Sequence, residues 1–320
     1  MSRKLVTVIP GLKQEYRGRI EACARAHGFE ALFFESAAQA LPHLADAEIV
    51  FGQDGRLAQS APKLGWLCTP SAGINQFTGE GAFLNPTALL TNSSGAYGVT
   101  ISEHVIMVTL EILRRQREYE AIVARREWRR DLAVRSLHGI RALLLGTGDI
   151  GCEVALRLRA FGPESIVGVN RSGRNPRMLF DRIEMEEKLD ELLPACELAV
   201  LSLPDTPKTF RMLDKRRLGL LPDGAVIVNV GRGSVIDEEA LARELASRRL
   251  YAALDVFKQE PLNRDDPLWD CPNLILTPHV SGNMTLPYTI DRIVKMFLED
   301  LEHYCRGERL AHLVDIRRGY

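Results

Sequence analysis

The stretch from Arg141 to Gly151, which reads Arg-Ala-Leu-Leu-Leu-Gly-Thr-Gly-Asp-Ile-Gly, constrains the fold of this chain more than any other. Its apolar run Ala142–Leu145 predicts a short buried strand, and the pattern over Cys152–Ala160 predicts a helix. A strand, a G-x-G-x-x-G turn and a helix in this order are typical of a dinucleotide-binding unit. The sequence therefore predicts a nucleotide cofactor at this turn.

The residues of this turn have separate physical roles. Gly146 permits a tight turn, Gly148 lets the backbone approach a pyrophosphate, and Gly151 lets the helix pack closely against the strand. Backbone N–H groups at the helix start, at Asp149 and Ile150, lie at the positive end of the helix dipole and can bind phosphate. The carboxylate of Asp149 is unusual beside a phosphate, and we expect it to act as an N-terminal cap.

Composition excludes several classes of protein. A chain of 320 residues is long enough for two domains, and a net charge of −1 provides no basic surface for nucleic acid. No apolar run reaches membrane length, and the N-terminal residues enter a strand pattern rather than a signal peptide. The six cysteines are scattered, with no C-x-x-C pair, which favours reduced thiols over disulfides or a metal site. We expect a cytoplasmic protein with no metal, membrane or nucleic-acid partner.

Strand and helix patterns alternate along the chain, which predicts an α/β fold with parallel, helix-covered sheets. The predicted strands are Lys4–Pro10, Ala31–Glu35, Glu48–Gly52, Gly65–Thr69, Ala88–Thr91, Ala142–Leu145, Ser165–Asn170, Leu198–Leu203, Ala225–Val230, Ala252–Val256 and Leu274–Leu276. Besides Cys152–Ala160, the predicted helices are Gln14–His27, Met185–Leu193, Asp237–Arg248, Pro287–Tyr304 and a short one over Lys208–Leu213. We expect the last long helix, Pro287–Tyr304, to pack back on the first domain.

One run without a breaker, Ile101 to Trp128, separates the two series of strands. As a single helix it would span roughly 40 Å at 1.5 Å per residue. Arginines in its second half and just beyond it alternate with acidic residues, which favours a solvated face or a subunit contact over nucleic-acid binding. These arginines are Arg125, Arg126, Arg129 and Arg130.

The residues after the second strand of a dinucleotide domain indicate which cofactor binds. An acidic residue there binds the ribose 2′-hydroxyl of NAD, and a nearby Arg accommodates the 2′-phosphate of NADP. This chain has Asn170 at that place, followed by Arg171, Ser172 and Arg174. Guanidinium groups can pair with a phosphate bidentately, and a serine hydroxyl can donate to it. We therefore predict NADP(H), with NAD(H) as the alternative.

Four later stretches place polar groups at the ends of predicted strands, where open α/β sheets bind their ligands. They are Leu203-Pro204-Asp-Thr-Pro, Asn229-Val230-Gly231-Arg232 through Asp237, Leu254–Pro261 and Thr277–Gly282. Arg232, Glu260 and His279 recur at successive strand ends. Reduction of a keto group calls for a cation to hold the substrate and an acid to supply a proton, and these residue types fit that chemistry.

With these motifs in order, the chain resembles the D-isomer-specific 2-hydroxyacid dehydrogenase family over nearly its whole length. The closing Val314–Tyr320 and the segment Pro278–Gly282 are similar to its glyoxylate/hydroxypyruvate reductase branch. The resemblance implies a Rossmann doubly wound parallel sheet, residues 100–285, inserted into a smaller flavodoxin-like α/β substrate domain, residues 1–99 plus 286–320. It also implies an active site in the cleft between the domains and a homodimer.

The resemblance assigns roles to single residues. Arg232 would bind the keto oxygen and carboxylate of the substrate, and Glu260 and His279 would form the acid/base pair. Asp255 would contact the nicotinamide carboxamide. The backbone N–H groups of Ala72 and Gly73 would hold the substrate carboxylate, which suits a glycine that permits positive φ. Further cofactor contacts are expected at Leu203, Pro204, Val230 and Gly231, and His104 beside Glu103 is the nearest further histidine that could support the site.

Two functions from different classes remain open at this point. The first is NADPH-dependent reduction of a 2-keto acid to the D-2-hydroxy acid, with glyoxylate or hydroxypyruvate fitting a small pocket and phenylpyruvate or a branched acid a larger one. The alternative is a non-catalytic, nucleotide-sensing binding protein on the same fold, which an intact Arg232, Glu260 and His279 set does not exclude. Formate dehydrogenase fits less well, because that relative replaces the acid partner of the His and Glu260 is retained here.

Overall fold

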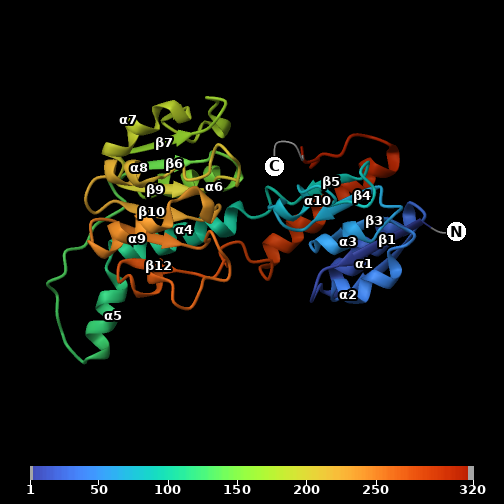
Figure 1. The fold of residues 1–320 in the computed structure, drawn as a ribbon, viewed down its shortest axis with the longest axis horizontal. Coiled ribbons are helices and arrows are strands. Elements are labelled where there is room, and N and C mark those ends of the chain that lie inside the picture. Colours follow the sequence, from blue (N-terminus) through green and yellow to red (C-terminus); the bar gives the residue numbers. More distant parts are fainter. Residues whose placement is uncertain (1–2, 316–320) are drawn as a thin grey trace. The chain divides into compact units, whose positions relative to one another are not determined.

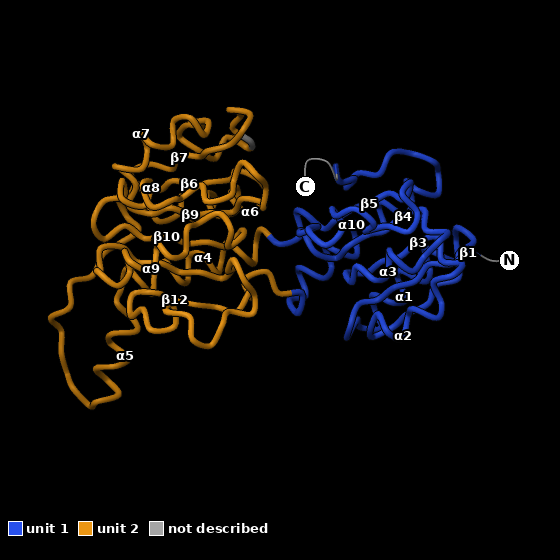
Figure 2. The backbone as a smooth tube through the Cα atoms, viewed as in Figure 1, with its two compact units in different colours: residues 1–97, 284–320 blue, residues 98–283 orange. Residues whose placement is uncertain are grey.

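The computed structural model describes residues 3–315 of the chain. These fold as two compact units, of which unit 1 comprises residues 1–97 and 284–320 and unit 2 comprises residues 98–283 (Figure 2). Residues 1–2 and 316–320, which include most of the closing segment Val314–Tyr320, lie outside the described residues. Both units are α/β, as the alternating patterns predict.

The sheet of unit 1 has the strand order β2-β1-β3-β4-β5, and every pair in it is parallel (Figure 1). This is the flavodoxin-like order. The strands are apolar and largely buried because helices and loops cover a parallel sheet on both faces. Their bounds are β1 Arg3–Val8, β2 Phe29–Phe34, β3 Ala47–Gly52, β4 Trp66–Thr69 and β5 Leu89–Asn92.

The helices of unit 1 come from both ends of its sequence. They are α1 Gln14–Ala26, α2 Ala37–Ala40, α3 Gly55–Gln59 and α10 Pro287–Arg306. Phe297 of α10 stacks on Phe51 and Trp66 of the sheet, with ring centroids 4.1 and 5.2 Å apart. The prediction that the C-terminal helix packs on the first domain is therefore confirmed, and α10 ends at Gly307, whose φ of 69° suits a glycine cap.

The sheet of unit 2 has the order β12-β11-β10-β9-β6-β7-β8, again with every pair parallel. Counted from β6, this is the doubly wound order 3-2-1-4-5-6 with β12 added at the edge, so the predicted Rossmann sheet is confirmed. The bounds are β6 Arg141–Leu145, β7 Ser165–Val169, β8 Arg182–Glu184, β9 Leu198–Leu201, β10 Val226–Asn229, β11 Tyr251–Leu254 and β12 Leu274–Leu276. Strand β8 is absent from the prediction because it has only three residues, two of them are charged, and none is fully buried.

The position of β6 decides where a ligand can bind in unit 2. This strand pairs with β7 on one side and β9 on the other, so the order of the sheet reverses beside it. Open α/β sheets bind ligands outside the carboxyl ends of their strands at such a point. The glycine turn after Leu145 lies at that place.

Two helices replace the single helix predicted over Ile101–Trp128. Helix α4 spans Gly98–Leu113 and α5 spans Gln116–Ala124, separated by Arg115 with a φ of 57°. The chain returns after α5, and the N–H of Arg135 bonds to the carbonyl of Leu113 over 2.8 Å. This bond satisfies a carbonyl at the end of α4. Because the donor comes from a distant part of the chain, the local sequence pattern does not reveal where α4 ends.

Other predicted helices of unit 2 also differ from the structure. The segment Lys208–Leu213 is a turn, and the helix there is α8, Lys215–Leu220, which begins after the capping residue Asp214. Met185–Leu193 is divided into short helical turns. The other helices of unit 2 are α6 Asp149–Arg159, α7 Leu189–Leu192 and α9 Glu238–Ala246.

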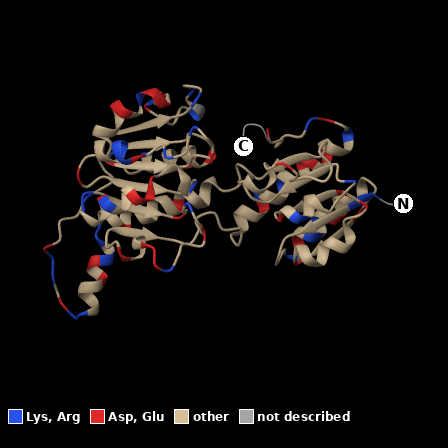
Figure 3. Ribbon diagram, in the orientation of Figure 1, with Lys and Arg blue, Asp and Glu red and all other residues tan. Residues whose placement is uncertain are grey.

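Residues of both charges occur along the segment that follows α5 (Figure 3). Arg125 pairs with Glu127 over 2.7 Å, and Arg129 pairs with Asp131 over 2.6 Å. Acidic partners therefore neutralise arginines that could otherwise suggest a nucleic-acid surface. Among residues 3–315, we find no helix that combines the length and the hydrophobicity needed to cross a membrane.

Candidate active site

The glycine turn after β6 has the geometry expected of a phosphate-binding loop. Gly146 adopts a φ of 103°, and a Cβ placed there would lie 2.8 Å from the Oγ of Ser202. A Cβ at Gly151 would collide with the carbonyl oxygen of Gly146, so only glycine lets α6 approach β6 this closely. A Cβ at Gly148 would meet nothing within 4 Å. Packing within the chain therefore does not explain Gly148, whereas close approach of a ligand does.

The N-terminus of α6 offers its backbone N–H groups without a side-chain cap. The N-cap residue is Gly148, and no side chain bonds there. Asp149 is the first helical residue, and its carboxylate accepts a hydrogen bond from the N–H of Gly98 over 2.8 Å. The expectation that Asp149 caps α6 is thus wrong, because its side chain bonds to the start of a different helix, α4.

Arg177 supplies positive charge beside this turn, a contribution that the sequence analysis missed. Its guanidinium lies 2.8 Å from Glu153 and 3.8 Å from Asp149, and it partly balances both carboxylates. Arg177 adopts a φ of 56° in a turn well downstream of α6. No local motif marks such a residue.

The loop after β7 presents the residues expected at the 2′-phosphate. Asn170 organises it: its amide donates to the hydroxyl of Thr147 and the carbonyl of Arg174, over 2.7 and 2.9 Å. Its oxygen accepts from the N–H groups of Ser172 and Gly173. The side chain of Asn170 is therefore engaged within the loop, while Arg171, Ser172 and Arg174 are exposed.

The loops after β9 and β10 lie against each other. A Cβ at Gly231 would be 2.7 Å from the backbone N and O of Leu203, so glycine is required for this contact. The N–H of Val230 bonds to the carbonyl of Leu201 over 3.0 Å. The predicted cofactor contacts Leu203, Pro204, Val230 and Gly231 thus belong to adjacent strand ends.

Unit 2 brings Arg232, Glu260 and His279 together. The Nδ1 of His279 lies 2.7 Å from Oε2 of Glu260, and Oε1 of Glu260 accepts from the N–H of Phe257 over 2.9 Å. Burial lowers the pKa of Arg232, and the negative charges of Glu260 and Asp205 oppose that shift. An Arg side chain stays charged in any case. The site therefore holds a fixed cation, a carboxylate and an imidazole oriented by that carboxylate.

Asp255 holds His279 in a strained backbone conformation. His279 has a φ of 54°, a left-handed value that costs a non-glycine residue about 1–3 kcal/mol. The carbonyl of Asp255 accepts from the N–H of His279 over 2.8 Å. Its carboxylate accepts from the N–H groups of Val280 and Ser281, over 2.9 and 3.0 Å, and from the hydroxyls of Thr277 and Ser281.

These bonds determine the ionisation of Asp255. Burial raises the pKa of this carboxyl group, but the hydrogen bonds from Ser281, Thr277 and Val280 outweigh that effect, and the pKa is lowered overall. His104 lies behind the same loop, with its Nε2 3.4 Å from the hydroxyl of Thr277. Burial lowers the pKa of His104, against the opposing charges of Asp255 and Glu111.

The loop predicted to hold the substrate carboxylate lies in unit 1. The carbonyl of Ala72 accepts from the amide of Asn92, and that of Gly73 accepts from the hydroxyl of Ser71, over 2.8 and 2.7 Å. Side-chain bonds from Ser71 and Asn92 to these two carbonyls define the loop. The role of the N–H groups of Ala72 and Gly73 stays a prediction.

Comparison with known proteins agrees with this geometry. Residues 106–281 match the family model of the NAD binding domain of D-isomer specific 2-hydroxyacid dehydrogenases. The chain belongs to this family. As a member of the D-isomer specific 2-hydroxyacid dehydrogenases it is an NAD(P)-dependent oxidoreductase with a nicotinamide cofactor.

Individual relatives extend the match to both units. Glyoxylate/hydroxypyruvate reductase B of Pectobacterium atrosepticum is 30% identical over 251 residues, which cover 75% of this chain and 78% of the relative. A D-isomer specific 2-hydroxyacid dehydrogenase family protein from Aeromonas salmonicida has a TM-score of 0.88 and 31% identity, covering 99% of this chain and 100% of that one. An NADPH-dependent glyoxylate/hydroxypyruvate reductase from Sinorhizobium meliloti, solved with NADP and sulfate, has a TM-score of 0.83 and 26% identity, with coverage of 99% and 100%.

Proposed function

We propose that this dehydrogenase reduces a 2-keto acid such as glyoxylate or hydroxypyruvate to the D-2-hydroxy acid, with NADPH as reductant. The observation that supports it most is the 2.7 Å contact between Nδ1 of His279 and Glu260, on the same unit as Arg232. The nicotinamide cofactor supplies the hydride. Unit 2 would be the dinucleotide-binding domain and unit 1 the substrate domain.

The side chains divide the remaining chemistry. Glu260 holds Nδ1 of His279, which leaves Nε2 to donate a proton to the keto oxygen as negative charge develops there. Arg232 offers a planar pair of donors to the keto oxygen and the carboxylate. The backbone N–H groups of Ala72 and Gly73 would hold the far end of the carboxylate.

The preference for NADPH rests on the loop after β7. Asn170 shapes that loop through its own hydrogen bonds, so Arg171 and Arg174 are presented in a defined turn without an acidic neighbour at the strand end. A 2′-phosphate placed there would meet guanidinium groups rather than a carboxylate. The Sinorhizobium meliloti reductase, a relative over both units, was solved with NADP.

Absorbance of NADPH tests the proposal directly. The chain is incubated with glyoxylate, hydroxypyruvate or phenylpyruvate, and each reaction is repeated with NADH. We expect oxidation of NADPH with at least one of the two smaller acids and a lower kcat/KM with NADH. Binding of NADPH without turnover of any 2-keto acid would instead support the nucleotide-sensing function.

We further propose that the working form is a cytoplasmic homodimer. Helix α5 and the segment after it expose large apolar side chains, with Trp128 92% and Val123 67% exposed. Such groups are commonly covered at subunit contacts. Light scattering should give a mass twice that of the chain, and a monomeric mass at the concentrations used for assay would contradict the proposal.

A further inference from the structure

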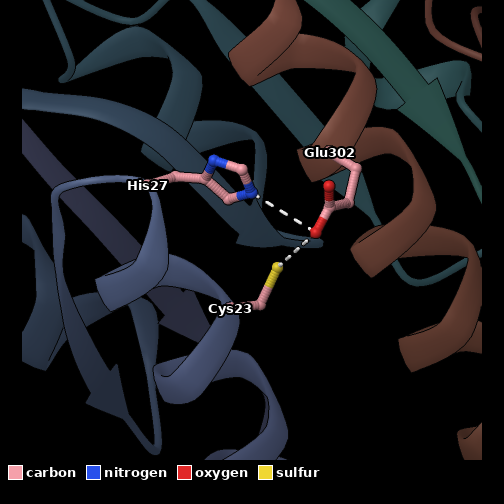
Figure 4. Close-up of side chains that lie close together, drawn as sticks. All are labelled: Cys23, His27 and Glu302. Atoms are coloured by element: carbon pink, nitrogen blue, oxygen red, sulfur yellow. Dashed lines mark hydrogen bonds and ion pairs between the residues drawn. The ribbon is translucent and has the colours of Figure 1, made fainter.

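Helices α1 and α10 of unit 1 bring together a cysteine, a histidine and a glutamate. The glutamate is far from the other two residues in the sequence. Cys23 lies on α1, His27 is the residue that ends α1, and Glu302 lies on α10 (Figure 4). One ligand atom from each residue lies within 4.8 Å of the other two. All three side chains are partly buried, so a small ion could reach them from solvent.

The distances in this cluster fit a metal ion better than strong hydrogen bonds. The Sγ of Cys23 lies 3.7 Å and the Nε2 of His27 lies 3.3 Å from the same carboxylate oxygen, Oε1 of Glu302. With Zn–S near 2.3 Å and Zn–N or Zn–O near 2.0 Å, tetrahedral geometry separates S from O by about 3.5 Å and N from O by about 3.3 Å. The observed spacings are close to both values, whereas strong N–H···O bonds are shorter.

The spacing, orientation and charge of these three side chains favour binding of a divalent cation. Cys23 and His27 are four residues apart, which places them on one face at the end of α1. Arg306 binds Oε2 of Glu302 over 2.8 Å, so the carboxylate is held with Oε1 directed at Cys23 and His27. A thiolate and a carboxylate together balance the two positive charges of the ion, and thiolate with imidazole favours zinc over magnesium or calcium.

We propose that Cys23, His27 and Glu302 form a Zn²⁺ site that fastens the first helix of unit 1 to its last. Three protein ligands leave a fourth position for water. The site is separate from Arg232, Glu260 and His279, which lie in unit 2, and so it acts on stability rather than on the reaction. The ion would join residues 279 positions apart in the sequence, and because it binds the folded state it would stabilise that state by mass action.

Metal titration of the full-length, reduced and chelator-treated protein tests the site. Zn²⁺ is added against a chromophoric chelator, and Co²⁺ serves as a spectroscopic substitute that shows thiolate ligation by a charge-transfer band. We expect one equivalent bound, with the band present. Cys23→Ser should remove the band, and His27→Gln and Glu302→Gln should each weaken Zn²⁺ binding at least about tenfold.

Matched variants separate this site from adventitious binding. Cys271→Ser and His138→Gln change residues of the same types in unit 2, away from the cluster, and both should bind Zn²⁺ as the parent does. Absence of stoichiometric binding by the parent would overturn the proposal. Unchanged binding by the Cys23, His27 and Glu302 variants would do the same.

Thermal unfolding provides a second, activity-independent readout. Because Zn²⁺ binds the folded state, saturating ion should raise the Tm of the parent, and the increase should disappear in Cys23→Ser. Without metal, Cys23→Ser and the parent should unfold at similar temperatures. An equal loss of Tm with and without Zn²⁺ would show that the cluster is a hydrogen-bond network between α1 and α10, and the zinc proposal would be rejected.

Discussion

The carboxylate of Asp149 accepts the backbone N–H of Gly98 over 2.8 Å and so ties the first turn of α6 to the first residue of α4. Gly98 is also the first residue of unit 2 along the chain. A Cβ on Gly98 would collide with the same carboxylate and with the Cγ of Glu153, so this contact requires glycine at position 98. This contact explains an acidic residue in a turn whose other features favour phosphate.

Removal of that contact should destabilise unit 2. Asp149→Ala should lower the free energy of unfolding by about 1.5–3 kcal/mol, the usual contribution of a hydrogen bond to a charged group. Gly98→Ala should give a similar loss, and the double variant should lose less than the sum, because both changes break one bond. Urea unfolding measures all three, with Gly18→Ala in the open face of α1 as a control that should not destabilise. Additive losses would show that the two residues act independently.

His279 should be essential for reduction and dispensable for cofactor affinity. His279→Gln removes the proton donor and should lower kcat by about 10²–10⁴-fold, the range for general acid catalysis, while the Kd for NADPH stays near that of the parent. Steady-state kinetics and NADPH fluorescence titration measure the two quantities. His303→Gln, which removes another histidine paired with a carboxylate at 2.9 Å, serves as the control. A large loss of NADPH affinity in His279→Gln would show that the residue is structural.

The loop after β7 should set the cofactor preference. Arg171→Ala combined with Arg174→Ala should raise the KM for NADPH by about ten- to a hundredfold, because charge-assisted bonds to phosphate contribute roughly 1.5–3 kcal/mol. The KM for NADH should change little. Arg126→Ala, an exposed arginine near the end of α5, is the matched control. Equal effects on both cofactors would place the arginines elsewhere than at the 2′-phosphate.

Asp255 should stabilise the loop that carries His279, and its effect should depend on pH. Hydrogen bonds lower the pKa of Asp255 below its ordinary value of 3.8, so its stabilisation is present above that pH and is lost as the pH falls through the folded-state pKa. Asp255→Asn replaces an acceptor oxygen with an NH₂ group that faces the N–H and hydroxyl donors of the loop. It should lower kcat, and the free energy of unfolding should fall less steeply at acid pH than in the parent. Denaturant unfolding between neutral pH and pH 3 measures this. An unchanged acid limb would refute the role of the charge.

His312 should give the opposite dependence. Its hydrogen bond to the buried Asp300, 3.0 Å long, raises the pKa of His312 above its ordinary value of 6.5. Stability from this pair is therefore fully present below pH 6.5 and is lost as the pH rises through the folded-state pKa. His312→Gln should remove that decline. The melting temperature measured from pH 5 to pH 9 tests it, and parallel profiles of parent and variant would contradict it.

Much of the fold could be read from local pattern because apolar runs and glycines act locally. Leu143–Leu145 are apolar and buried, Gly146 and Gly151 occupy positions where any side chain would collide, and α10 ends where Gly307 permits a left-handed cap. The motifs around Arg232, Glu260 and His279 likewise name the residues that unit 2 brings together. Their spacing along the chain follows from strand ends that share one edge of a parallel sheet.

Local pattern alone predicted the strands of both sheets except β8, and it predicted the residue types of the candidate site. Tertiary structure decided what each polar group bonds to. The N–H of Arg135 bonds to the last carbonyl of α4, and the N–H of Gly98 bonds to the carboxylate of Asp149. Glu302 contacts Cys23 only because α10 packs on α1. These contacts join residues far apart in the chain, and hydrogen bonds and ligand sets carry no periodicity that a sequence pattern could show.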